Sequence, residues 1–199
     1  MPYKKPLQKR SVESEAKFLM AMDNLLREKS FEDVTVEEIS CLAGLTKSAF
    51  LQRFGTKEQA LFVLFSKYAD EASRIMEEVT RDLDNKLTIE KTLSTISSRF
   101  DQLLQKHFSA NRAMNEYIKR RMESHELTKK IFGECIQMMS VIQRLWFAET
   151  YSIEGAKAAA QLLVSLNFHY TMRAMPAFPA DAALRHQLFA ELIVVSIKR

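Results

Sequence analysis

The chain has 199 residues, enough to bury a substantial core either as one domain or as a small domain joined to a larger one. Hydrophobic residues make up 47% of it and charged residues 27%, which is ordinary for a globular protein and disfavours wholesale disorder. The chain contains only four glycines and four prolines, so a fold of many short strands and tight turns is disfavoured. We therefore expect an all-α protein.

Positive charge is concentrated at the N-terminus. The formal net charge is +4, and Lys4, Lys5, Lys9 and Arg10 all precede the first acidic residue, Glu13. Such a basic arm suits an anionic polymer such as DNA, although a solvated tail has the same composition. The composition of the arm leaves both interpretations open.

Several functional classes lack their sequence signals. No segment is apolar over the length of a membrane span, and the first residues lack a signal-peptide core, so we expect a cytoplasmic protein with no membrane partner. Cys41 and Cys135 show no metal or redox spacing and are expected to be buried thiols. The four histidines are widely separated, and no phosphate-binding loop or nucleophile elbow occurs. We expect no metal, no cofactor and no catalytic residue; an enzyme site assembled from distant residues is the less favoured alternative.

The first helix is predicted from about Ser11 to Lys29, because apolar residues recur there on one helical face. A second helix is predicted after Thr35, which can cap it, with Glu38 as the reciprocal partner of a capping box. This short helix reaches Ala43 and meets Gly44, which takes a positive φ without steric penalty.

A third helix is predicted directly after this glycine. Thr46 is a further capping residue, and Phe50 and Phe54 recur four positions apart on one face. Gly55 ends this helix, and residues 56–59 supply a capping box for a long fourth helix. Two short helices that share one glycine turn are the helix-turn-helix arrangement of DNA-binding proteins.

In this arrangement the helix from Val36 to Leu42 braces the helix from Lys47 to Phe54, which enters the major groove. Phe50 and Phe54 are expected to face inward, which turns the polar residues of the second helix outward. Glutamine pairs with adenine, arginine with guanine, and lysine with phosphate, so these side chains suit DNA. An ordinary helical corner with a solvated polar surface is the alternative that a bare helix-turn-helix pattern leaves open.

The stretches Phe31 to Ile39, Ala43 to Phe50 and Phe54 to Leu61 resemble the N-terminal signature of the TetR family of repressors. The resemblance covers about residues 18–65, and the turns, caps and core positions match in register. It implies a three-helix DNA-binding domain, a long connecting fourth helix and a larger helical body that binds an effector. It also implies a ligand-responsive repressor that binds a palindromic operator in double-stranded DNA as a homodimer.

The expected domains are residues 1–55, with the basic arm and the helix-turn-helix, and residues 56–199, with effector binding and dimerisation. The DNA contacts that the resemblance and the residue chemistry together imply are Lys4, Lys5, Lys9, Arg10, Thr35, Thr46, Lys47, Ser48, Ala49, Gln52, Arg53 and Lys57. Lys47 and Lys57 are assigned to phosphates, and residues 48, 49, 52 and 53 to bases. The amides at the helix start after Thr56 can hold a further phosphate.

Two positions depart from the family pattern. Ser30 stands where glycine is frequent at a positive φ, so a small conformational cost is expected there. Residues 51–53 are Leu-Gln-Arg where the family frequently has Tyr-Tyr-His, so the tyrosine commonly held against a phosphate is absent.

Five further helices are expected in the body, at about residues 88–108, 110–122, 127–149, 154–175 and 181–198. The fourth of these opens with small residues that allow a close helix–helix approach. The last carries Leu184, Leu188, Leu192 and Val195 at helical spacing. We expect these two helices to form a four-helix seam in a homodimer; packing only within the monomer is the alternative.

Methionine and aromatic residues of the body suit a small apolar or aromatic effector, because methionine repacks easily. Each of them is individually better explained as core. The expected lining is Phe62, Phe65, Tyr68, Phe100, Met114, Tyr117, Ile118, Phe132, Cys135, Met138, Met139 and Trp146. A helical module that binds small molecules or proteins without operator DNA is the competing interpretation, and the basic arm, Lys47 and Arg53 argue against it.

Overall fold

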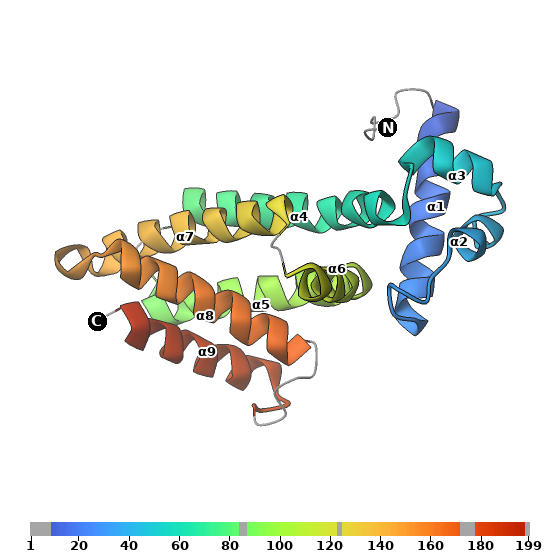
Figure 1. The fold of residues 1–199 in the computed structure, drawn as a ribbon. Coiled ribbons are helices and arrows are strands. Elements are labelled where there is room, and N and C mark those ends of the chain that lie inside the picture. The colour runs from blue at the N-terminus through green and yellow to red at the C-terminus, as the bar shows by residue number, and fades with distance from the viewer. Residues whose placement is uncertain (1–8, 84–86, 123–124, 172–177, 198–199) are drawn as a thin grey trace. The chain divides into compact units, whose positions relative to one another are not determined.

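The computed structural model describes residues 9–83, 87–122, 125–171 and 178–197, and within them the secondary structure is helical without strands (Figure 1). The elements are α1 (Lys9–Glu28), α2 (Val36–Leu42), α3 (Lys47–Phe54), α4 (Lys57–Asp82), α5 (Ile89–Lys106), α6 (Phe108–Arg121), α7 (Glu126–Trp146), a 3-10 turn (Ala148–Thr150), α8 (Ile153–Thr171) and α9 (Ala182–Ile197). The all-α prediction is confirmed. None of the described helices is both long and apolar enough to cross a membrane.

The chain forms two compact units. Unit 1 consists of residues 1–68 and 107–123, and unit 2 consists of residues 69–106 and 124–199. The helix α6 therefore belongs to the same unit as the helix-turn-helix, and α4 contributes residues to both units. The sequence pattern gave no indication of this placement of α6, because the partners of α6 lie far away along the chain.

Aromatic rings form the centre of unit 1. Phe18 of α1 meets Phe50 and Phe54 of α3 nearly edge-on, with ring centroids 5.3 and 6.0 Å apart. The centroids of Phe50 and Phe54 are 4.9 Å apart, and all three side chains are buried. The predicted inward orientation of the two α3 phenylalanines is thus confirmed.

Polar side chains of α6 bind the end of α1 and the segment after it. The Arg112 guanidinium donates to the carbonyl of Lys29 over 2.8 Å and also to the carbonyl of Leu26. The last carbonyls of a helix have no partner within the helix, so Arg112 caps α1 from outside. The Glu116 carboxylate accepts the backbone N–H of Phe31 over 3.0 Å. In this way α6 fixes the point at which the chain leaves α1.

The core of unit 2 contains a charged cluster. Asp101 of α5 lies 3.1 Å from Nη2 of Arg185 on α9, and both side chains are buried. Thr171 donates a hydrogen bond to the other carboxylate oxygen over 3.0 Å, and the guanidinium stacks 3.7 Å from the ring centroid of Tyr170. His186 also faces Asp101, but burial lowers the pKa of its imidazole. The carboxylate charge is therefore balanced by Arg185, and the cluster ties α5 to α9.

The two cysteines differ in their surroundings. Cys135 is buried in α7, and desolvation raises the pKa of its thiol to about 12. Cys41 is exposed on α2. The prediction of buried thiols is therefore confirmed for Cys135 and wrong for Cys41, because only the neighbouring positions 39 and 40 of α2 face the core.

Replacing Asp101 with asparagine is expected to destabilise the protein by about 3–5 kcal/mol, because Arg185 is left as a buried charge without a counter-ion. Urea unfolding followed by circular dichroism measures the loss. Asp82→Asn is the matched control, since Asp82 pairs with Arg81 at the surface with both side chains largely exposed. The control is expected to unfold like the wild type, and equal unfolding midpoints for the two variants would contradict the role of the buried pair.

Candidate nucleic-acid interface

The start of α2 is fixed by the capping box that the sequence predicts. Thr35 Oγ1 accepts the N–H of Glu38 over 3.2 Å, and the Glu38 carboxylate accepts the N–H of Thr35 over 2.9 Å. A hydrogen bond from Lys29, together with those from Thr35, lowers the pKa of Glu38 to about 2. Glu38 therefore stays ionised at neutral pH, which keeps it a strong acceptor for the N-cap amide.

Gly44 makes the turn between α2 and α3. Its φ is +65°, and the chain after it is held by a hydrogen bond from Leu45 N–H to the Ser40 carbonyl over 3.0 Å. A Cβ built on Gly44 would meet nothing within 4 Å. The requirement for glycine is thus conformational and not one of space.

Beyond this turn, α3 projects its polar face into solvent. Thr46 caps the helix, with Oγ1 accepting the N–H of Ala49 over 3.1 Å. Because the phenylalanines of α3 are buried, Lys47, Ser48 and Gln52 are exposed on the other side, and Ala49 is half-buried. The geometry that a reading helix requires is therefore present.

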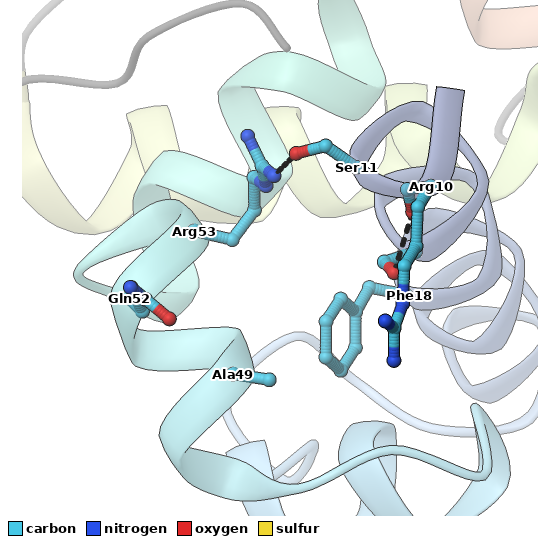
Figure 2. A pocket seen from close by; sticks show the side chains of 7 residues that line it. Arg10, Ser11, Phe18, Ala49, Gln52 and Arg53 are labelled. Atoms are coloured by element: carbon cyan, nitrogen blue, oxygen red, sulfur yellow. Dashed lines mark hydrogen bonds between the residues drawn. The ribbon is translucent and has the colours of Figure 1, made fainter. Parts of the chain in front are cut away.

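A hollow lies between the first turns of α1 and the outer side of α3 (Figure 2). Its lining consists of Arg10, Ser11, Ser14, Phe18, Ala49, Gln52 and Arg53. Figure 2 shows Arg53 reaching from α3 towards α1, where its guanidinium donates to Ser11 Oγ. The hollow thus gathers two arginines and two serines from both helices, which are donors of the kind that contact DNA.

Two of the expected phosphate-binding lysines have different surroundings. Lys47 forms a surface ion pair with Glu37 in the first turn of α2, and this hydrogen bond lowers the pKa of Glu37. Lys57 instead lies against the loop between α1 and α2. Its Nζ donates to the carbonyls of Phe31 and Val34, each over 2.8 Å, and to that of Glu32 over 3.2 Å.

The other expected contacts divide as follows. Thr35 and Thr46 are both exposed N-caps, at the starts of α2 and α3. Arg10 lines the hollow, whereas Lys4, Lys5 and the side chain of Lys9 lie outside the described residues.

The conformational cost expected at Ser30 does not arise, because Met122 is the only non-glycine residue with a positive φ in the part of the chain that the structure describes. Ser30 instead donates to Asp33 over 2.6 Å.

The residues expected to line an effector pocket are distributed over both units. Unit 1 contains Phe62, Phe65, Tyr68, Met114, Tyr117 and Ile118, and unit 2 contains Phe100, Phe132, Cys135, Met138, Met139 and Trp146. Some make ring contacts within unit 1, such as Phe62 with Tyr117 at 5.2 Å between centroids. Phe132 is 37% exposed, whereas Met138 and Met139 are buried. Core packing therefore accounts for most of this set.

Comparison with known families decides the identity of the first domain. Residues 19–63 match the family model of bacterial regulatory proteins, tetR family. Residues 19–63 therefore carry a tetR-family domain. The match spans α2, α3 and their shared turn, which include the exposed polar side of α3, and it confirms the resemblance seen in the sequence.

Solved structures of TetR-family regulators share the fold of the whole chain. PfmR, a TetR family transcriptional regulator from Thermus thermophilus, is 18% identical with a TM-score of 0.65, and the match covers 92% of this chain and 99% of PfmR. NalD, the secondary repressor of the MexAB-OprM multidrug efflux pump in Pseudomonas aeruginosa, is 17% identical with a TM-score of 0.63 over 95% of this chain and 98% of NalD. A TetR-like regulator from a Rhodococcus species is 10% identical with a TM-score of 0.65 over 96% of this chain and 97% of that regulator. No curated protein sequence matches the chain.

The tetR-family match at residues 19–63 supports a DNA-binding transcriptional regulator, and the solved structures show that the fold is shared. TetR-family proteins are regulators, which agrees with the expectation that the chain is not an enzyme.

Gly44→Ala is expected to destabilise the protein by about 1–2 kcal/mol, because an L-residue is strained at this positive φ even where its Cβ has room. Gly133→Ala is the matched control: Gly133 lies within α7, and its added Cβ also meets nothing within 4 Å. That change is expected to stabilise by about 0.5–1 kcal/mol through helix propensity. Urea unfolding of both variants measures whether the free energy of unfolding falls in Gly44→Ala and rises in Gly133→Ala. An unchanged free energy of unfolding in Gly44→Ala would refute the argument that the turn requires glycine.

Proposed function

We propose that the protein is a homodimeric repressor that binds a palindromic operator through α3 and is released by a small apolar or aromatic effector. The observation that carries the proposal is the orientation of α3, whose phenylalanines are buried while Lys47, Ser48 and Gln52 face solvent. In a helix-turn-helix protein this face meets base edges in the major groove. The tetR-family match at residues 19–63 favours this role over an ordinary helical corner with a solvated polar surface.

An exposed apolar surface on α8 and α9 supports the dimer. These two helices pack together in unit 2 (Figure 1), and their apolar side chains Ile153, Leu184, Leu192 and Val195 are between 41% and 56% exposed. A shallow hollow beside them is lined in part by Ala158 and Leu162. A second copy of the same surface would remove these side chains from water. Sedimentation that gives only monomer at micromolar concentration would contradict this assignment.

A dimer gives the operator its symmetry. Two α3 helices related by a two-fold axis fit successive major grooves on one face of DNA when they lie about 34 Å apart. The operator expected from this is a palindrome with half-sites about one helical turn apart. Repression is proposed by likeness to NalD, which is described as a repressor.

Release by an effector requires that the effector binds one dimer conformation more tightly than the other. Helix α4 contributes residues to both compact units and leads directly from the helix-turn-helix, and on this ground it is proposed to carry such a change. The effector class is proposed from the methionine and aromatic residues of the body.

Recovery of bound sequences from a random DNA pool at a fixed salt concentration tests the function directly. Enrichment of one palindrome establishes both operator binding and half-site spacing. If the recovered sequences share no motif, the protein does not read a specific operator and the proposal fails.

Lys47→Ala is expected to weaken binding to all DNA sequences and to lower the salt dependence by about one counterion, because the exposed ammonium is assigned to a phosphate. The measurement is the slope of the logarithm of the binding constant against that of the salt concentration. Lys91→Ala, at an exposed position on α5 in unit 2, is the matched control and keeps the wild-type slope. An unchanged slope for Lys47→Ala would remove the phosphate assignment.

Arg53→Ala is expected to weaken specific binding by about 1–3 kcal/mol and to relax base preference at one operator position. Titration of single-base operator variants measures the preference. Ser11→Ala is the control, because it removes only the hydrogen bond that α1 accepts from Arg53 and leaves the guanidinium in place. If Arg53→Ala lowers affinity for every operator variant equally, Arg53 does not read a base.

A further inference from the structure

Lys57 is the first residue of α4, and its ammonium group meets three backbone carbonyls of a single loop. The acceptors are the carbonyls of Phe31 at 2.8 Å, Glu32 at 3.2 Å and Val34 at 2.8 Å. A lysine ammonium has three N–H donors and no acceptor, so these contacts use its full donor capacity. The same ammonium lies 4.5 Å from the ring centroid of Phe31, where the face of the ring also attracts a cation.

The loop needs these bonds. It connects α1 to α2, and its carbonyls at Phe31 and Val34 are partly buried, where an unpaired backbone acceptor is costly. The next residue along the chain is Thr35, the N-cap of α2. Whatever holds the loop therefore also sets where α2 begins, and α2 is the helix that braces α3.

Helix α6 holds the same loop through a backbone N–H group. The carboxylate of Glu116 on α6 accepts the N–H of Phe31 over 3.0 Å, while Lys57 binds the carbonyl of that residue. All of these contacts lie within unit 1. The backbone of Phe31 is thus fixed through both its N–H and its carbonyl. Two loop side chains add to this attachment, since the Phe31 ring lies against the Lys57 ammonium and the Glu32 carboxylate lies 3.4 Å from Nη1 of Arg120 on α6.

We infer that Lys57 is a positioning residue that clamps the loop between α1 and α2 to the start of α4, and that it is not a contact to DNA phosphate. A phosphate oxygen would have to displace carbonyls that already use every donor of the ammonium. This assignment rests on the proposed operator binding, because its purpose is to hold α2 and α3 in the arrangement that reads DNA.

The clamp selects lysine over arginine. An ammonium is a compact point charge with three donors spread around one nitrogen, whereas a guanidinium is a wide planar fork. Three carbonyls that converge on one nitrogen fit an ammonium and do not fit a guanidinium. A phosphate contact has no such preference, since arginine binds phosphate at least as well as lysine.

The test compares Lys57→Arg with Lys47→Arg, because both changes keep the positive charge. Hydrogen exchange is measured on the free protein, and operator affinity is measured as a function of salt. For Lys57→Arg we expect faster exchange confined to residues 31–35 and α2. We also expect about tenfold weaker operator binding, of the size that a lost hydrogen bond to a charged group gives, with an unchanged salt slope. Lys47→Arg is expected to behave like the wild type in all three measurements.

Three results would overturn the clamp. The first is wild-type exchange and affinity in Lys57→Arg. The second is a salt slope reduced by about one counterion in Lys57→Met, which is the signature of a lost phosphate contact. The third is a uniform rise in exchange throughout unit 1, which would show general destabilisation and not positioning. The exchange measurement uses no DNA, so it tests the clamp even if the wild type recovers no operator and the proposed function itself fails.

Discussion

The contact of Phe18 with Phe50 and Phe54 decides which side of α3 faces solvent. The three rings fill the space between α1 and α3 nearly edge-on, an arrangement that aromatic rings favour. Because two of the rings come from α3 at positions four residues apart, rotation of this helix about its axis would expose one of them. Burial of the phenylalanine side of α3 therefore leaves the polar side of this helix facing solvent. The glycine turn at Gly44 is useful only in combination with this anchor, since a turn by itself does not fix the rotation of the helix that follows.

The reading surface carries paired charges before any DNA is bound. Lys47 of α3 lies against Glu37, and Lys29 lies against Glu38, so two acidic residues of α2 pair with nearby basic residues. The pair of Lys47 with Glu37 is largely exposed, and exposed ion pairs contribute little to stability. In the proposed complex with DNA, a phosphate would therefore replace Glu37 as the partner of Lys47 at small cost in stability. The pair of Lys29 with Glu38 differs in its role, because the Glu38 carboxylate also accepts the N–H of Thr35 and so stabilises the start of α2.

Features that depend on neighbours three or four positions apart could be predicted from the sequence. The capping box of Thr35 and Glu38, the cap at Thr46 and the positive φ at Gly44 all follow from local chemistry, and the structure has each of them. Features that join distant segments could not. The family resemblance and the chemistry of lysine imply a phosphate contact for Lys57, and nothing local indicates carbonyl acceptors more than twenty positions earlier.

The same limit applies to the body. Asp101 and Arg185 are 84 positions apart, and neither has a sequence pattern that marks it as buried.

The exposure of Cys41 likewise depends on which side of a seven-residue helix meets the core, which a helix this short does not specify through its own periodicity. Apolar spacing located the helices of the body well, but spacing states only that a face is apolar. It does not state whether the partner of that face is another helix of the same chain or a second copy.

The loop between α1 and α2 joins the helix-turn-helix to the rest of unit 1 through backbone atoms. Arg112 binds the carbonyls at the end of α1, Glu116 binds the N–H of Phe31, and Lys57 binds the carbonyls that follow. These acceptors and donors on the loop are main-chain groups, and the side chains of Phe31 and Glu32 add contacts to Lys57 and Arg120. A shift of α4 or α6 therefore moves these bonds directly. An effector that alters either helix thus needs no contact with α3 to change how α3 is presented.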